Sequence, residues 1–261
     1  MAGERVVFIG AGPGAADLIT VRGARLLAQA EVVLFDALTD PALRELAPQA
    51  RWVNVGKRGF ADSTAQATIN ALLVRHAQRS GLVVRLKGGD PSVFGRLEEE
   101  LEALAAAGIA CEVVPGITAA SAAAAATLRP LTRRGSGRSV SLATAMTAPQ
   151  LGGAAPMRNA DTEVFYMAGK QLAALSRKLI DAGWPADAPA LVVSRAGWPD
   201  MLASEHTAAT LAQAAVLHAG RPAVVTVGAG AVALAARAQD PAPIDPVKST
   251  AVEASPSPEP P

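Results

Sequence analysis

Two loops that contain glycine turns carry the residues whose types and spacing are best suited to binding chemistry. The first lies in VVRLKGGDPSVFGR and the second in CEVVPGITAA, and each follows a β-branched run and precedes a helical pattern. Gly88, Gly89 and Gly116 have no Cβ, so bare backbone can approach a ligand at these positions. At the tip of the first loop, the Asp90 carboxylate can accept hydrogen bonds from a ligand ammonium group or from ribose hydroxyls. The pair of loops therefore predicts one small-molecule site between them.

A third glycine loop, GAGPGA, offers a different interpretation of the amino-terminal part. Gly10, Gly12 and Ala15 fit the dinucleotide-binding pattern, and Asp36 ends the next predicted strand about twenty residues later. Taken alone, this spacing favours a Rossmann dinucleotide oxidoreductase that uses NAD or a flavin. The pattern leaves the two later loops unexplained, so the oxidoreductase is kept as an alternative.

Several segments occur together in a characteristic order. They are RVVFIGAGPG, AEVVLFDAL, NVGKRG, the two loops above, RPLTRRGSGRSV and VFYMAGKQLAALSRKLIDAG. In this order they resemble the tetrapyrrole methylases that use S-adenosyl-L-methionine, and the resemblance runs up to about Arg237. It implies an α/β fold class, with two α/β domains and a ligand cleft between them.

The resemblance also implies a reaction. This is the S-adenosylmethionine-dependent C-methylation of uroporphyrinogen III, in two methyl transfers that give precorrin-2 for sirohaem or cobalamin synthesis. S-adenosyl-L-homocysteine is then the second product, no metal is required, and a homodimer is expected. The chain has no counterpart of the dehydrogenase and ferrochelatase unit of fused sirohaem synthases, so release of the dimethylated product is expected. The same motifs also fit a methylase of a later corrin precursor or a non-catalytic tetrapyrrole-binding protein.

The chemistry of methyl transfer asks for few reactive groups. A sulfonium donor and a pyrrole carbon must be aligned and shielded from water, and a ring proton must then be managed by a carboxylate or an amine. By resemblance, Asp36 is the proton acceptor and Lys57 the proton donor. From the residues alone, Asp36 could also cap a helix near Pro41 or bind ribose, and Lys57 could pair with a substrate carboxylate.

The binding residues are carried over from the family residue by residue. The predicted donor site comprises Pro13, Gly88, Gly89, Asp90, Val93, Thr118, Ala119, Met167 and Ala196. Uroporphyrinogen III bears carboxylates around its ring, so its site should concentrate cations although the formal net charge is only +1. The predicted substrate-binding residues are Arg58, Arg133 and Arg134.

Alternating strand and helix patterns must position these residues, and they favour α/β layers. An N-terminal α/β domain is predicted at 1–128, with strands at 6–9, 32–35, 52–55, 82–86 and 111–114 and helices at 64–79 and 97–107. A C-terminal α/β domain is predicted at 139–239, with strands at 139–143, 163–166, 191–193 and 223–227 and helices at 171–182, 208–217 and 229–237. Residues 129–138 are predicted to form a basic junction, and the Pro- and Ser-rich tail at 240–261 is predicted to be disordered.

Composition favours a protein of the cytoplasm. Half of the 261 residues are hydrophobic, which suffices for one large core or two smaller ones. The single cysteine, Cys111, excludes a disulfide framework, and its apolar neighbours predict a buried thiol. The near-neutral charge argues against a nucleic-acid partner, the N-terminus shows no secretory leader, and Pro and Gly interrupt the uncharged stretch 139–157, which argues against a membrane span. The three histidines show no metal-ligand spacing.

Overall fold

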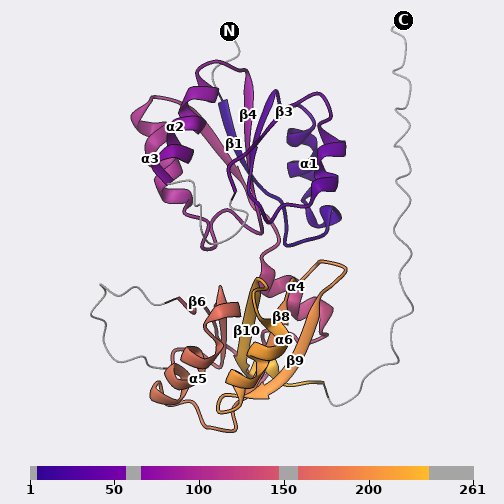
Figure 1. Cartoon of the computed structure of the whole chain (residues 1–261), viewed down its shortest axis with the longest axis vertical. Coiled ribbons are helices and arrows are strands. Elements are labelled where there is room, and N and C mark those ends of the chain that lie inside the picture. The colour runs from indigo at the N-terminus through magenta and orange to yellow at the C-terminus, as the bar shows by residue number, and fades with distance from the viewer. Residues whose placement is uncertain (1–4, 57–65, 147–157, 235–261) are drawn as a thin grey trace, which may run out of the picture.

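The computed structural model describes residues 5–56, 66–146 and 158–234, which form two α/β domains, one above the other in Figure 1. The first domain is built on a parallel sheet with strand order β3-β2-β4-β1-β5. Its strands are β1 (Arg5–Gly10), β2 (Val32–Phe35), β3 (Arg51–Asn54), β4 (Leu82–Lys87) and β5 (Ala110–Val114). One face is covered by α1 (Val21–Leu27) and a 3-10 helix (Pro41–Leu46), the other by α2 (Gln66–Ala77) and α3 (Leu97–Ala106).

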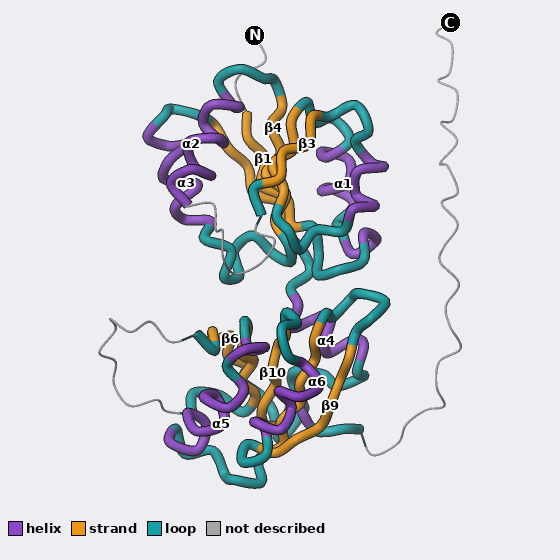
Figure 2. The backbone as a smooth tube through the Cα atoms, in the orientation of Figure 1, coloured by secondary structure: helices purple, strands orange, loops and turns teal. Residues whose placement is uncertain are grey.

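The central strands form because their apolar runs are buried on both faces. Val6, Val7, Phe8 and Ile9 of β1 are all fully buried, as is usual for a parallel strand with helices on both sides. The carboxyl ends of these strands lead into loops that face the second domain, shown in teal in Figure 2. This arrangement places the glycine loops at the border between the two domains.

The second domain is built on a mixed sheet with strand order β6-β7-β10-β8-β9, in which only β6 and β7 are parallel. Its strands are β6 (Val140–Thr144), β7 (Thr162–Tyr166), β8 (Pro189–Ser194), β9 (Leu202–Thr207) and β10 (Ala223–Gly228). One face carries α5 (Leu172–Asp181) and the 3-10 helix Leu211–Ala214, which leads into α6 (Ala215–His218). The other face packs against α4 (Ala119–Ala126). The predicted fold class, α/β with two domains, is confirmed.

The chain passes from one domain to the other before α4. Ala120 and Ala123 of this helix pack against strands of the second sheet, and the first sheet ends with β5. The prediction placed everything up to 128 in the first domain and made 129–138 the junction. The packing instead groups α4 with the second sheet, and Arg129, which is buried, donates a hydrogen bond to the carbonyl of Ala231 (2.7 Å).

Some predicted elements differ from the structure. All nine predicted strands are present. The strand β9 was missed because four of the six residues in its sequence, LASEHT, are polar and the strand lies at the sheet edge. The helix predicted at 208–217 is a turn, a 3-10 helix and a short α-helix. The helix predicted at 229–237 begins as the 3-10 helix Ala229–Ala231 and does not continue as an α-helix through 234.

Cys111 is exposed, so the prediction of a buried thiol is wrong. The reason is that β5 is an edge strand of the first sheet, with neighbours on one side only. The tail predicted at 240–261 lies outside the described residues. No helix in the described ranges has the length and apolar character needed to cross a bilayer.

Candidate active site

Three glycine loops meet at the carboxyl ends of the strands of the first sheet. The Gly89 N–H donates to the carbonyl of Gly12 (2.9 Å), and the Gly12 N–H donates to the carbonyl of Gly89 (3.2 Å). A Cβ on Gly10 would lie 2.5 Å from the Cα of Gly116, so no side chain fits there. Ligands of open parallel sheets bind outside the carboxyl ends of the strands. The glycines therefore allow the loops to pack on one another where a ligand is expected.

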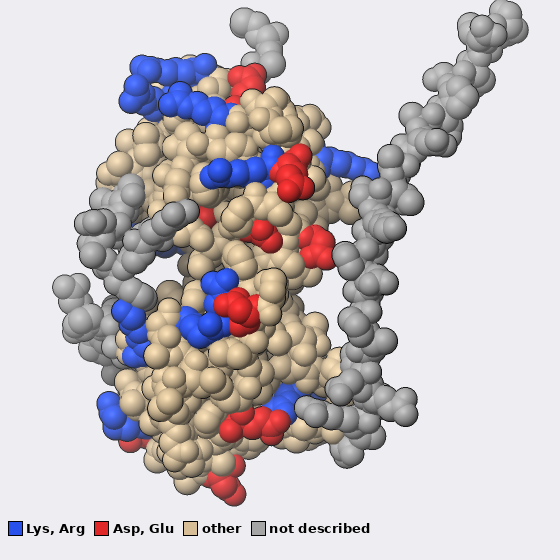
Figure 3. Space-filling view, turned by 45° about the vertical axis from the view of Figure 1, so that its right-hand side comes forward, with Lys and Arg blue, Asp and Glu red and all other residues tan. Residues whose placement is uncertain are grey.

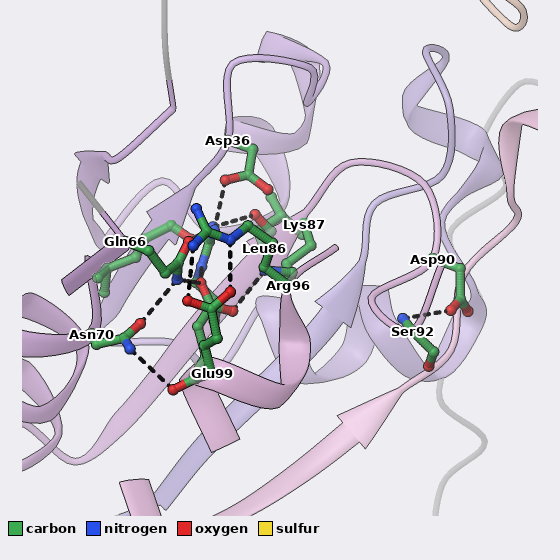
Figure 4. A network of polar contacts seen from close by, with 12 residues as sticks. Asp36, Gln66, Asn70, Leu86, Lys87, Asp90, Ser92, Arg96 and Glu99 are labelled. Carbon is green, nitrogen blue, oxygen red and sulfur yellow. Dashed lines mark hydrogen bonds and ion pairs between the residues drawn. The ribbon is translucent and has the colours of Figure 1, made fainter. Parts of the chain in front are cut away.

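Asp90 joins two of these loops. Its Oδ1 accepts the backbone N–H of Ser92 (2.8 Å, Figure 4), and its Oδ2 accepts the backbone N–H of Gly116 (2.8 Å). A carboxylate has about four lone-pair sites, so two remain for a ligand. The residue predicted to meet a ligand thus also fixes the distance between the loops.

The second domain closes the site from the other side. The hydroxyls of Thr118 and Tyr166 share a hydrogen bond (2.7 Å), and the Ala15 N–H donates to the carbonyl of Gly197 (2.8 Å). Gly197 lies so close to Pro13 that a Cβ would be 1.9 Å from the Pro13 oxygen. Burial raises the pKa of Tyr166, so its hydroxyl stays protonated at neutral pH.

The remaining predicted donor residues gather at this border. Val93, Ala119 and Ala196 pack with Tyr166 in one hydrophobic cluster. Met167 follows Tyr166 directly and is 45% exposed, so it is not a core residue. The structure therefore brings residues from five separate segments to one place, as a shared ligand requires.

Strained backbone is concentrated in the same loops. Non-glycine residues with positive φ are uncommon, and their strain tends to collect at functional sites. Of the five described residues of this kind, four lie in the loops of the site: Phe94 (φ 53°), Arg96 (φ 53°), Met167 (φ 57°) and Arg195 (φ 53°). The ring of Phe94 also contacts that of Tyr166, with centroids 4.9 Å apart. Phe94 and Tyr166 were missed from the sequence, because neither stands out from ordinary core aromatics there.

Asp36 follows β2 directly and is bound by a buried arginine. Its Oδ1 accepts from Nη2 of Arg85 (2.7 Å), and Arg85 also donates from Nε to Glu100 (2.9 Å). Burial alone would lower the pKa of Arg85, but the charges of Asp36 and Glu100 outweigh it and hold this pKa above its ordinary value. The Asp36 side chain is 29% exposed, so it can be reached from outside.

Lys87 shares the same buried carboxylate. Its Nζ donates to Glu100 (2.6 Å), which is completely buried. Burial, and then the charge of Arg85, lowers the pKa of Lys87 below its usual range despite the pairing with Glu100. Sequence reasoning missed this network, although Val83, Arg85 and Lys87 alternate along one strand and so share a face.

The two described arginines that were predicted to bind substrate, Arg133 and Arg134, do not lie at the donor loops. Lys57 and Arg58 lie outside the described residues. Arg133 donates to the carbonyl of Val232, after the end of β10, and Arg134 is exposed on the adjoining turn. Ala223, the first residue of β10, pairs with Ser194, the last residue of β8, and Ala196 follows two residues later. The donor loops therefore lie at the start of β10, whereas Val232 follows its end. In the described ranges, no group of three or more His, Cys, Asp or Glu side chains is arranged to hold a metal ion.

Glycine loops at the ends of a parallel sheet, closed by loops of a mixed sheet, define a class of two-domain α/β proteins that bind a small molecule at the domain border. Within this class, residues 5–215 match the tetrapyrrole (corrin/porphyrin) methylases, and the chain belongs to this family. The recognition made from the sequence is confirmed.

Two curated relatives and one solved structure illustrate what the chain is similar to. It is 45% identical over 194 residues to the uroporphyrinogen-III C-methyltransferase of Pseudomonas aeruginosa, which covers 74% of this chain and 79% of that protein. It is 40% identical over 232 residues to the enzyme of the same name from Synechocystis, covering 86% and 88%. The crystal structure of uroporphyrin-III C-methyltransferase from Thermus thermophilus with S-adenosyl homocysteine superposes with a TM-score of 0.74 at 36% identity, covering 86% of this chain and 97% of that one.

Proposed function

We propose that the chain transfers methyl groups from S-adenosyl-L-methionine to uroporphyrinogen III, in two steps that give precorrin-2 and S-adenosyl-L-homocysteine. The observation that carries this proposal is the convergence of the three glycine loops with Asp90 and the second domain. Family membership and the names of the relatives support the substrate and the donor. The complex of the Thermus thermophilus enzyme with S-adenosyl homocysteine supports an adenosyl ligand.

The donor occupies the loops from Pro13 to Ala196 that meet at the domain border. In each transfer, the bond between sulfur and the methyl carbon breaks, and its electron pair stays on sulfur. A ring carbon supplies the electron pair of the new carbon–carbon bond, and a ring proton leaves. The alignment of the two reactants and the exclusion of water contribute most of the rate.

Asp36 accepts the ring proton in this proposal, and Lys57 is the proton donor. Asp36 fits the role because it is partly exposed and because one of its oxygens accepts no hydrogen bond from the described part of the chain. The finer parts of the proposal are a cytoplasmic homodimer and substrate contacts from Arg58, Arg133 and Arg134. Arg133 lies at the end of the second sheet opposite the donor loops.

The test is incubation of the purified protein with uroporphyrinogen III and isotopically labelled S-adenosyl-L-methionine. Mass spectrometry should find two labelled methyl groups on each macrocycle and two molecules of S-adenosyl-L-homocysteine released for each macrocycle. The Asp36→Asn variant should bind S-adenosyl-L-homocysteine like the wild type but turn over about 100- to 10,000-fold more slowly. Binding of NAD without any response to S-adenosyl-L-homocysteine would favour the oxidoreductase instead.

A further inference from the structure

Two cations lie on the buried face of a strand in the middle of the first sheet. Val83, Arg85 and Lys87 of β4 point to the side covered by α2 and α3, where Val83 packs with Leu73 and Leu104. Strands of parallel sheets are normally apolar on both faces, and the burial of a charge costs several kcal/mol unless it is paired. Arg85 is 2% exposed and Lys87 is 3% exposed. The two buried charges therefore need partners that offset this cost.

One buried carboxylate pairs with both cations. Glu100 of α3 is 0% exposed and accepts from Nε of Arg85 (2.9 Å) and from Nζ of Lys87 (2.6 Å). Gln66 of α2 adds a longer contact to the same carboxylate (3.4 Å). Figure 4 shows the network between the helices and the strand end. Glu100 therefore fixes the position of the Arg85 guanidinium from the side covered by α3.

The other nitrogens of Arg85 are also engaged. Nη1 donates to the carbonyls of Leu86 (3.1 Å) and Leu34 (3.4 Å), and Nη2 donates to Asp36 (2.7 Å). A planar guanidinium held at three nitrogens has one orientation, which a lysine cannot reproduce. Of the two carboxylates that Arg85 binds, Glu100 is fully buried and Asp36 is partly exposed. The rigid network thus ends at the one carboxylate that a substrate can reach.

We propose that Arg85, held by Glu100, is a positioning residue for methyl transfer: it binds Oδ1 of Asp36 and leaves Oδ2 to take the ring proton. This inference rests on the proposed function, which makes Asp36 the proton acceptor. The purely structural alternative is a buried ion network that only stabilises the sheet. The two roles differ in one respect, since a positioning residue acts through Asp36 and a stabilising residue does not.

A double-mutant cycle separates the positioning role of Arg85 from a purely stabilising role. Arg85→Gln should lower kcat about 10- to 100-fold, since a misplaced catalytic group costs that much, and should leave the affinity for S-adenosyl-L-homocysteine unchanged. In the Asp36→Asn background, Arg85→Gln should cause no further loss of kcat, because the group that it positions is already disabled. Single-turnover measurements with excess enzyme give the slow rates, and thermal unfolding is recorded for every variant.

The matched control is Arg129→Gln. Arg129 is buried to a similar extent and is paired with a carboxylate, Glu205, but it lies in the second domain and does not contact Asp36. Its replacement should lower the melting temperature and leave kcat unchanged. If Arg85→Gln does not fold, Arg85→Lys enters the same cycle, since it keeps a charge opposite Glu100 but loses the planar fork.

The outcomes distinguish the two levels of the argument. The positioning role would be overturned if Arg85→Gln lowered kcat equally in the wild-type and Asp36→Asn backgrounds. It would also be overturned if Arg85→Gln alone kept the wild-type kcat. Either result would leave the proposed methyl transfer intact. Wild-type turnover in Asp36→Asn would overturn the role of Asp36 and with it the positioning inference. A wild-type protein that adds no methyl group to uroporphyrinogen III would overturn the proposed function itself.

Discussion

Asp90 shows how a single side chain serves both the fold and the site. Its two oxygens hold the N–H groups of Ser92 and Gly116, at 2.8 Å each, so the charge lies between two loops. Asp90→Ala should weaken the binding of S-adenosyl-L-homocysteine about 10- to 100-fold, because charge-assisted hydrogen bonds are lost and the loops are released from one another. Calorimetric titration measures this affinity.

Asp90→Asn is the matched control for that change. The amide keeps the size of the side chain and one carbonyl oxygen, so it can accept from one of the two loop N–H groups. We expect an affinity between those of the wild type and Asp90→Ala. An unchanged affinity in Asp90→Ala, together with a lower melting temperature, would mean that Asp90 is only a structural link and that the ligand binds elsewhere.

His218 predicts how stability depends on pH. It is fully buried, with Nδ1 at 2.8 Å from the Ser194 hydroxyl and Nε2 at 2.8 Å from the Ser204 hydroxyl. Burial, and then the charges of His206 and Arg221, lowers the pKa of His218 below its ordinary 6.5. The unfolded chain therefore binds this proton more readily, and stability falls as the pH drops from about 6.5 toward the lower folded pKa. Urea unfolding at several pH values should show a flatter dependence for His218→Gln, and an unaltered dependence would contradict the assignment.

At the scale of elements, the ends of the first sheet depend on glycine for a steric reason. A Cβ on Gly10 at the end of β1 would lie 2.5 Å from the Cα of Gly116 and 2.8 Å from the oxygen of Gly89, and both obstacles are backbone. Gly10→Ala should lower the free energy of unfolding by about 1–3 kcal/mol, which is the usual cost of overpacking. Gly81→Ala is the control, because its new Cβ meets the movable carboxylate of Glu31. Equal stability of both variants in urea unfolding would show that the loops separate easily.

The strands of both sheets could be predicted because continuous Val, Ile and Leu runs leave few alternatives. The polar edge strand β9 and the exposure of Cys111 could not, since strand order is a property of the whole sheet. The sequence predicts that Gly88, Gly89 and Gly116 face a ligand. It could not show that loop-to-loop contact also requires Gly116, where a Cβ would lie 2.3 Å from the oxygen of Gly89 and 2.7 Å from the Cα of Gly10. This contact depends on segments far apart in the chain.

The charged part of the site shows the same limit. A catalytic role for Asp36 could be predicted from a family motif. Its partner Arg85 could not be distinguished from an ordinary strand residue in the sequence, because its pairing with Glu100 depends on the fold. The alternation of Val83, Arg85 and Lys87 was the available signal. It could not be used without knowing that this face of β4 is covered by α2 and α3.

At the scale of the whole molecule, charge is spread and the site is assembled between the domains. Figure 3 shows basic and acidic side chains interspersed over the visible face, with a basic group at the end of the first domain away from the second. Arg51, Arg75 and Arg79 surround His76 at the amino-terminal side of the first sheet and help to lower the pKa of His76, after burial. These arginines are remote from the glycine loops, so a substrate rich in carboxylates must find its cations elsewhere.

The two domains are in close contact at Pro13 and Gly197, and this contact can be tested. Gly197 has φ +81°, and a Cβ there would lie 1.9 Å from the carbonyl oxygen of Pro13. Gly220 has φ +70° and nothing within 4 Å of its Cβ position, so it has the same left-handed backbone conformation without a steric contact. Gly220→Ala should cost about 1–2 kcal/mol from the left-handed conformation alone. Gly197→Ala should cost about 1–3 kcal/mol more, because the Pro13 loop must move away.

Urea unfolding of the two variants measures this difference, and calorimetry adds the functional consequence. If the ligand lies between the domains, Gly197→Ala should weaken the binding of S-adenosyl-L-homocysteine, while Gly220→Ala should leave it unchanged because Gly220 contacts none of the glycine loops. Equal affinities with unequal stabilities would place the ligand wholly within the loops of the first domain. The second domain would then serve the tetrapyrrole alone, and its loop at Gly197 would have no part in holding the donor.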